Sequence, residues 1–356
     1  MRRVRLPGGL RLVEAPRPGS PLAAVVLRVR VGSGDERPDE RGTAHMLEHL
    51  VVRCALAGGR VGEGALVSAR TGRESTAYSV VVRAFDAVRA VVALGAVFDE
   101  LRVPPDVLAA EQAAIVEEAA RRHAEPAWRI RESLLGGLWA GTAFEHPVLG
   151  DARVVASLTP RRVLRFHRTW YHPANATLVV VAGRPLPDVA AVASRWTGAP
   201  APPHRTDAPS RPWTATAGRD HAGIAFAYHR VDPAGSAAPV MLAREAVAAA
   251  SGVQVRTLPL GEWLCVWAAT AREPFIAALT RTRDRLTSAD GAAWLRTEAL
   301  IPTLRREDDV ETAAVRAADP RTLVTTDALL SCAPEPVAAV LTHWRNTITS
   351  GREGRG

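Results

Sequence analysis

The chain has 356 residues, of which 47% are hydrophobic and 23% are charged. These proportions are near the average of soluble globular proteins, so they exclude an intrinsically disordered chain and favour two domains of ordinary size. The formal net charge is +8, and every one of the 45 basic residues is an arginine. We attribute this bias to a GC-rich genome. An arginine-rich nucleic-acid-binding protein stays an alternative only, because the arginines are dispersed among acidic residues without a basic patch interleaved with aromatic residues.

The cysteine pattern and the apolar stretches indicate in which cellular compartment the protein is expected. Cys54, Cys265 and Cys332 are odd in number and far apart, which argues against a disulfide framework and favours a reducing compartment. The basic N-terminus leads into no sustained apolar run, so we expect no signal peptide. The longest apolar stretches have the length of strands and are too short to cross a bilayer. We expect a cytoplasmic protein with no membrane association.

Hydrophobic periodicity predicts alternating strands and helices in the first half of the chain. The predicted elements are strands within 4–14 and 22–32, a helix over 38–56, an extended segment over 67–83, helices over 85–101, 105–123, 126–139 and 160–170, a strand over 176–182 and a helix over 189–196.

Five prolines between residues 197 and 219, without apolar periodicity, predict a linker. Beyond it the predicted elements are strands over 223–228, 262–269 and 322–325 and helices over 239–250, 274–287, 293–300 and 336–348. This mixed order is typical of α+β domains rather than of strict βαβ alternation. The predicted organisation is an N-terminal domain over 1–198, a Pro-rich linker over 199–220, a C-terminal domain over 221–349 and a disordered tail over 350–356.

The residues that carry chemistry lie in the predicted helix over 38–56, where His45, Glu48 and His49 occur in the order H-M-L-E-H. Residues four apart share one face of a helix, so both imidazoles can reach one cation while Glu48 borders the same site. Imidazole nitrogens one turn apart suit Zn²⁺, which binds nitrogen ligands in tetrahedral geometry. A catalytic zinc site needs a third protein ligand.

The predicted helix over 105–123 carries candidates for that ligand. Glu111 and Glu118 are two helical turns apart and face the same direction, whereas Glu117 points about 100° away from Glu118. We expect Glu118 to be the ligand and Glu111 to orient a ligating imidazole or the water. Glu48 is the expected general base for peptide hydrolysis. A solvated helix face is the alternative for Glu118 taken alone.

This pattern resembles the pitrilysin/insulinase family of zinc metallopeptidases, whose signature is an inverted H-x-x-E-H motif. The resemblance covers roughly residues 1–200. Besides the motif it rests on Gly32–Glu36, on the Glu111–Glu118 spacing, on Ala69-x-Thr71 with Thr76-x-Tyr78, and on landmarks from His146 to Asn175.

The resemblance implies two related two-layer α+β domains, with mixed β-sheets covered by helices and the second domain shortened. It implies a zinc metalloendopeptidase that cleaves peptides or leader- and presequence-type segments. It also implies that Ser68, Ala69, Thr71 and Tyr78, around an edge strand, bind the peptide substrate by β-addition. Ser68 stands where the family usually has asparagine.

The second half departs from the family pattern. It lacks the glycine-rich G-G-x-x-S-R-L element and any tyrosine after Tyr228, so an Arg/Tyr substrate-binding pair there is incomplete. We therefore expect a homologous partner subunit, in a hetero- or homodimer, to supply the missing surface. The alternative is a non-catalytic assembly subunit of a peptidase complex, although such members usually lose the metal motif that is present here.

Overall fold

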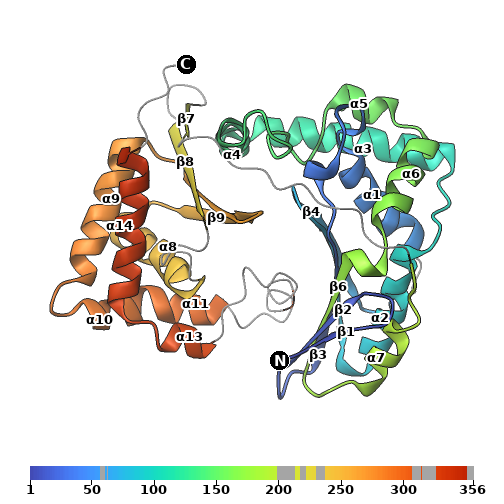
Figure 1. Cartoon of the computed structure of the whole chain (residues 1–356), viewed down its shortest axis with the longest axis horizontal. Helices are drawn as coiled ribbons and strands as arrows, with labels where there is room; N and C mark the ends of the chain where they lie inside the picture. The colour runs from blue at the N-terminus through green and yellow to red at the C-terminus, as the bar shows by residue number, and fades with distance from the viewer. Residues whose placement is uncertain are drawn as a thin grey trace. The chain divides into compact units, whose positions relative to one another are not determined.

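The computed structural model describes residues 1–56, 61, 63–198, 213–216, 222–229, 237–306, 314 and 326–350 (Figure 1). The chain divides into two compact units. Unit 1 is Met1–Ala120, His146–Arg205 and Asp309–Pro320, and unit 2 is Arg121–Glu145, Thr206–Asp308 and Arg321–Gly356.

Unit 1 contains a six-stranded sheet in the order β1-β2-β6-β3-β5-β4, in which β2 and β6 are parallel and the other neighbours antiparallel. The strands are Arg2–Arg5 (β1), Arg11–Pro16 (β2), Leu22–Val29 (β3), Leu66–Thr71 (β4), Thr76–Arg83 (β5) and Ala176–Ala182 (β6). The period-two alternation of side chains sends one set of residues into the core. Leu12, Leu178, Leu27 and Tyr78 thus lie opposite one another in a fully buried row across four strands.

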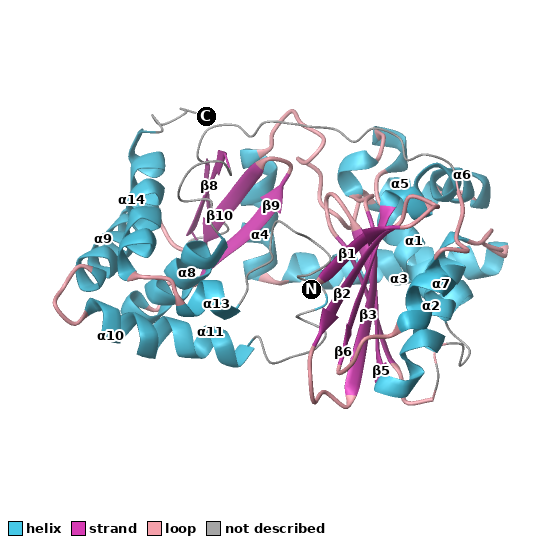
Figure 2. Cartoon of the chain, turned by 60° about the horizontal axis from the view of Figure 1, so that its bottom comes forward, coloured by secondary structure: helices cyan, strands magenta, loops and turns pink. Residues whose placement is uncertain are grey.

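Helices of unit 1 cover that apolar face of the sheet (Figures 1 and 2). They are Thr43–Val51 (α1), Ala87–Gly95 (α2), Pro105–Ala124 (α3), Ala152–Ser157 (α5), Pro160–Trp170 (α6) and Pro187–Ala193 (α7). A π-helical turn, Val52–Leu56, follows α1 directly, and short 3-10 turns occupy Ser33–Asp35, Pro38–Glu40, Ala84–Asp86, Ala96–Phe98 and Pro173–Asn175.

The helix Pro126–Leu138 (α4) belongs to unit 2 although it follows α3 after one residue. Pro126 stands at its first turn, where the missing N–H costs no hydrogen bond. Its apolar side chains, among them Leu134 and Leu138, pack against Ala225 and Cys265 of the second sheet. Unit 1 therefore differs from the predicted domain over 1–198, because burial of this apolar face removes Arg121–Glu145 from it.

Unit 2 contains a four-stranded antiparallel sheet in the order β7-β8-β10-β9. The strands are Trp213–Thr216 (β7), Ala222–His229 (β8), Val255–Leu260 (β9) and Trp263–Ala268 (β10). Alternate residues of β10 enter different cores: Val266 packs with the later helices and Cys265 with α4. The later helices are Ala237–Ser251 (α8), Arg272–Leu286 (α9), Gly291–Leu295 (α10), Ile301–Arg306 (α11), Thr326–Leu330 (α13) and Pro334–Ser350 (α14), with a π-helical turn at Arg296–Leu300.

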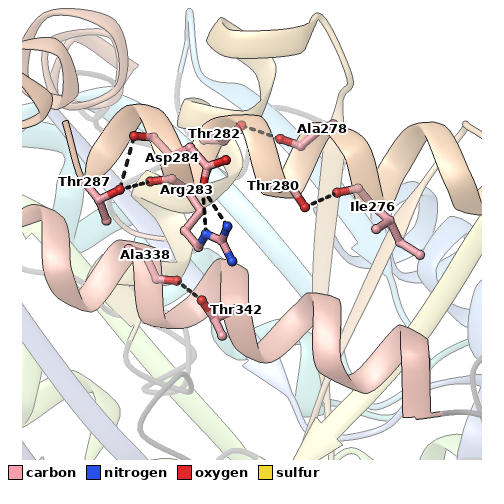
Figure 3. Close-up of polar contacts among 9 residues, drawn as sticks. All are labelled: Ile276, Ala278, Thr280, Thr282, Arg283, Asp284, Thr287, Ala338 and Thr342. Atoms are coloured by element: carbon pink, nitrogen blue, oxygen red, sulfur yellow. Dashed lines mark hydrogen bonds and ion pairs between the residues drawn. The ribbon is translucent and has the colours of Figure 1, made fainter.

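Threonines in α9 and α14 satisfy their hydroxyls within their own helix (Figure 3). Thr280, Thr282 and Thr342 each donate to the carbonyl oxygen four residues earlier, at 3.0, 2.8 and 2.9 Å. Thr282 is fully buried, where an unpaired hydroxyl would be costly. These polar residues therefore fit helices that otherwise pack through apolar side chains.

The α+β class predicted from the sequence is confirmed, with helices covering a mixed sheet in unit 1 and a smaller sheet in unit 2. Periodicity did not predict β7, β9 or α5, which are short. The predicted strand over 322–325 lies outside the described residues, as does the predicted linker except for β7. The predicted tail over 350–356 also lies outside them except for Ser350, which is the last residue of α14. Among the described helices, none combines the length and the apolar character that a bilayer crossing requires.

Candidate functional site

The N-terminus of α1 is fixed by a buried carboxylate and by two glycines. Glu36 accepts hydrogen bonds from the backbone N–H groups of Gly42 and Ala44, at 2.8 and 2.7 Å. Gly42 has a φ of 97°, which favours glycine, and a Cβ on Gly150 would lie 2.4 Å from the Gly42 Cα. This close approach locks the start of the helix that carries the H-x-x-E-H residues.

His45 and His49 lie one turn apart on α1, with their rings edge to face at a centroid distance of 4.8 Å. Burial and, to a smaller extent, the neighbouring His49 lower the pKa of His45 to about 4, although Glu118 opposes this shift. His45 is therefore neutral near pH 7, which is the form that ligates metals.

Glu118 of α3 completes a group of three residues that could hold a metal ion. Its Oε2 atom lies 3.7 Å from Nε2 of His45 and 3.7 Å from Nε2 of His49. Both distances exceed that of a hydrogen bond. Two ligand atoms each ~2.1 Å from a tetrahedral zinc stand ~3.4 Å apart, which is close to these two distances. The three ligand atoms all lie within 4.8 Å of one another, so the residues present fit such an ion.

A chain of polar contacts runs from His49 to the surface. Nδ1 of His49 lies 2.9 Å from Oε2 of Glu111, and Nη1 of Arg53 donates to Oε1 of Glu111 at 2.5 Å. Burial raises the pKa of Glu111, but the bonds from Arg53 and His49 outweigh it and the net pKa is lowered. A carboxylate at Nδ1 leaves Nε2 of His49 free to face Glu118.

Glu48 lies one residue before His49 and is largely buried. The hydroxyl of Thr71 donates to its Oε2 atom at 2.5 Å. Burial raises the pKa of Glu48, and the bond from Thr71 opposes this rise only in part. A carboxylate with a raised pKa is suited to accept and return a proton near neutral pH.

The predicted substrate-binding residues fall into different environments. Ser68 and Ala69 lie on β4, which is an edge of the sheet, and Ser68 is exposed. Thr71 is buried at the end of β4, against Glu48. The Tyr78 side chain is fully buried, with its hydroxyl 3.0 Å from that of Tyr171, so contact with a substrate would require the core to open.

Three functional contacts were not predicted from the sequence: those of Glu36 with the start of α1, of Arg53 with Glu111, and of Thr71 with Glu48. Arg53 follows His49 by four residues, so helical spacing could have predicted that the two side chains lie on the same face. The other two contacts depend on how the chain returns to α1, which local periodicity does not encode.

Known proteins resemble the part of the chain that contains these residues. The family model of insulinase (peptidase family M16) matches residues 12–152, which include His45, Glu48, His49 and Glu118. This part of the chain is therefore similar to the insulinase family.

A relative of the chain is an uncharacterized zinc protease of Mycobacterium tuberculosis, which is 32% identical over 189 residues. The match covers 51% of this chain and 43% of that relative, so the chain spans less than half of the relative's length.

Solved structures share the fold of the whole chain. The periplasmic protease PqqL of Escherichia coli has a TM-score of 0.71 and 17% identity, covering 98% of this chain and 46% of that one. A structure titled as an inactive M16 peptidase domain of Pseudomonas fluorescens has a TM-score of 0.69 and 13% identity, covering 96% of this chain and 94% of that one.

Proposed function

We propose that the chain is a zinc-dependent endopeptidase in which His45, His49 and Glu118 hold Zn²⁺ and Glu48 is the general base. The observation that carries this proposal is the convergence of two imidazole Nε2 atoms on one carboxylate oxygen, each at 3.7 Å. The names of the relatives as zinc proteases support the choice of metal.

The proposed role of each side chain follows from its environment. When bound, Zn²⁺ supplies a Lewis acid that activates water and polarises a carbonyl group. Glu48 takes the proton of the attacking water and returns it to the leaving amine, for which its raised pKa is suited. Thr71 holds the Glu48 carboxylate in one orientation, and Glu111 holds the His49 ring.

We propose that a peptide substrate pairs with β4, the edge strand next to Glu48. An edge strand presents unpaired backbone N–H and C=O groups, to which an extended peptide can add as a further strand. Ser68 and Ala69 would contact the peptide there, and Thr71 ties the same strand to the general base. Leader- or presequence-type segments fit this mode because they can be extended.

A homologous partner subunit is part of the proposal. The chain covers less than half of its relatives' length, and 46% of PqqL. A second unit of similar size would supply the binding surface whose sequence elements are absent from the second half of this chain. We also keep the cytoplasm as a prediction, which rests on the odd number and wide spacing of the three cysteines.

A non-catalytic assembly role is the second candidate, because one structural neighbour is titled an inactive domain. The nucleic-acid alternative gains no support from similarity to a peptidase family.

Metal analysis with a peptidase assay, with and without candidate partners, tests the proposal. We expect about one zinc per chain, loss of zinc in His49→Ala, and retention of zinc with loss of cleavage in Glu48→Gln. Wild-type cleavage by Glu48→Gln would refute the general-base role. Zinc binding without cleavage under every condition would favour the assembly role.

A further inference from the structure

Cross-strand pairing aligns four arginines in one row across the sheet of unit 1. The row passes through successive pairs: Arg5 opposite Arg11, Arg11 opposite Thr177, Thr177 opposite Arg28, Arg28 opposite Ala77, and Ala77 opposite Arg70. We call Arg5, Arg11, Arg28 and Arg70 the arginine row. It spans the whole sheet, from β1 to β4.

The arginine row lies on the face of the sheet opposite the helices. The neighbours of its members along the strands, Leu12, Leu27 and Ala69, pack with the helix-covered core. Because successive residues of a strand point to opposite faces, the arginines point away from that core. Arg5, Arg11 and Arg70 are exposed, and Arg28 is half-buried.

The described strands of unit 1 contribute no acidic residue to this face of the sheet. Glu14 is the one acidic residue in the six described strands of unit 1, and it lies on the other face, 2.8 Å from Arg2. Among their contacts, the side chains of Arg11 and Arg28 donate to the hydroxyls of Thr177 and Ser75, at 3.1 and 3.0 Å. No described residue forms an ion pair with Arg70. Arg70 therefore presents a positive charge that no described acidic residue neutralises.

Arg70 brings this charge to the candidate site. It lies on edge strand β4, between Ala69 and Thr71, and Thr71 contacts Glu48. A peptide paired with β4 places one side chain directly opposite Arg70, with Cβ atoms roughly 4.5–5.5 Å apart. A carboxylate at that position can accept two parallel hydrogen bonds from the guanidinium group. A lysine or arginine there would meet like charge.

We propose that this peptidase selects acidic peptides, and that Arg70 recognises an Asp or Glu in the substrate segment that pairs with β4. This inference rests on the proposed function. Side chains of the peptide that point to the Glu48 side would meet Val67 and Ala69, which are small and apolar. The preferred segment thus places an acidic residue opposite Arg70 and small apolar residues next to it.

Binding to a Glu48→Gln background tests the inference without requiring hydrolysis. The probes are two short fluorescent peptides of equal length, one alternating Ala with Glu and the other alternating Ala with Lys, measured by anisotropy at low and high salt. We expect the Glu peptide to bind at least about tenfold more tightly at low salt. Arg70→Glu should abolish or reverse this preference, and Arg70→Gln should reduce it.

Arg161→Glu is the matched control, because Arg161 is an exposed arginine on α6 and the change in net charge is the same. An unchanged preference in Arg161→Glu, with its loss in both Arg70 variants, supports the proposal. Equal binding of the two peptides by the background protein, or equal effects of Arg161→Glu and Arg70→Glu, would overturn it. Failure of the proposed function is a different result: the wild-type protein would then bind the Glu peptide in preference but cleave no peptide.

Discussion

The hydroxyl of Thr71 lies 2.5 Å from a carboxylate oxygen of Glu48, and so links the end of an edge strand to the candidate general base. Thr71 and Glu48 are 23 residues apart in the chain. The role of Thr71 in substrate binding stays a prediction, and this contact suggests a second role for the same residue. It orients the carboxylate relative to whatever peptide lies along the same strand.

The first prediction concerns this contact. Thr71→Val removes the hydroxyl with little change in size, so kcat should fall by about tenfold or more, as expected for a lost hydrogen bond to a charged group. Zinc content should not change, because Thr71 contacts none of the proposed ligands. Thr71→Ser keeps the hydroxyl and should keep most of the activity. Equal activity of the Val and Ser variants would show that the hydroxyl is dispensable.

The second prediction separates two adjacent glutamates of α3. Glu118→Ala should lose zinc and activity, because its Oε2 atom faces both imidazole Nε2 atoms. Glu117→Ala should lose little, because Glu117 is exposed and lies about 100° around the helix. Metal analysis of the two purified variants decides which glutamate binds zinc. Zinc loss in the Glu117 variant alone would move the ligand by one residue.

The third prediction concerns Arg53, which acts through Glu111 on His49. Arg53→Ala leaves the Glu111 carboxylate held by His49 alone, so zinc affinity should fall by about tenfold, as for other partners of ligating histidines. Competition with a chelator measures this, and Arg53→Lys should restore part of the affinity. Arg168→Ala is the control, because Arg168 makes a similar surface pair with Glu100 at 3.4 Å. Equal affinities of the Arg53 and Arg168 variants would exclude the relay.

The fourth prediction is a pH dependence of stability. Burial raises the pKa of Glu36 to about 8, although the N–H groups of Gly42 and Ala44 lower it. The folded state therefore holds this proton more tightly than the unfolded state. Its contribution to stability is present below the ordinary pKa of 4.5 and is lost as pH rises toward 8.

The titration of Glu36 changes the free energy of unfolding by at most about 1.4 kcal/mol per pH unit. Glu36→Gln should remove it, so the difference in free energy of unfolding between wild type and variant should change between pH 5 and pH 8. Denaturant titrations at the two values measure this difference. A difference that is independent of pH would mean that Glu36 titrates alike in both states.

Sequence alone predicted the residues that helical spacing controls. A spacing of four residues places His45 and His49 on one face of a helix, and a spacing of seven does the same for Glu111 and Glu118. Both follow because backbone geometry fixes the number of residues per helical turn. The structure brings these residues together as that spacing predicts. Their roles as metal ligands and as a supporting carboxylate stay predictions for the experiments above.

Tertiary structure alone decided how separate elements meet. Assignment of α4 to unit 2 depends on which apolar surface buries Leu134 and Leu138, and many surfaces are apolar enough for that. The Thr71–Glu48 contact and the arginine row depend on strand register, because a shift of one residue would turn every side chain to the opposite face. Register follows from the packing of the whole sheet, whereas helical spacing follows from the backbone of a single segment.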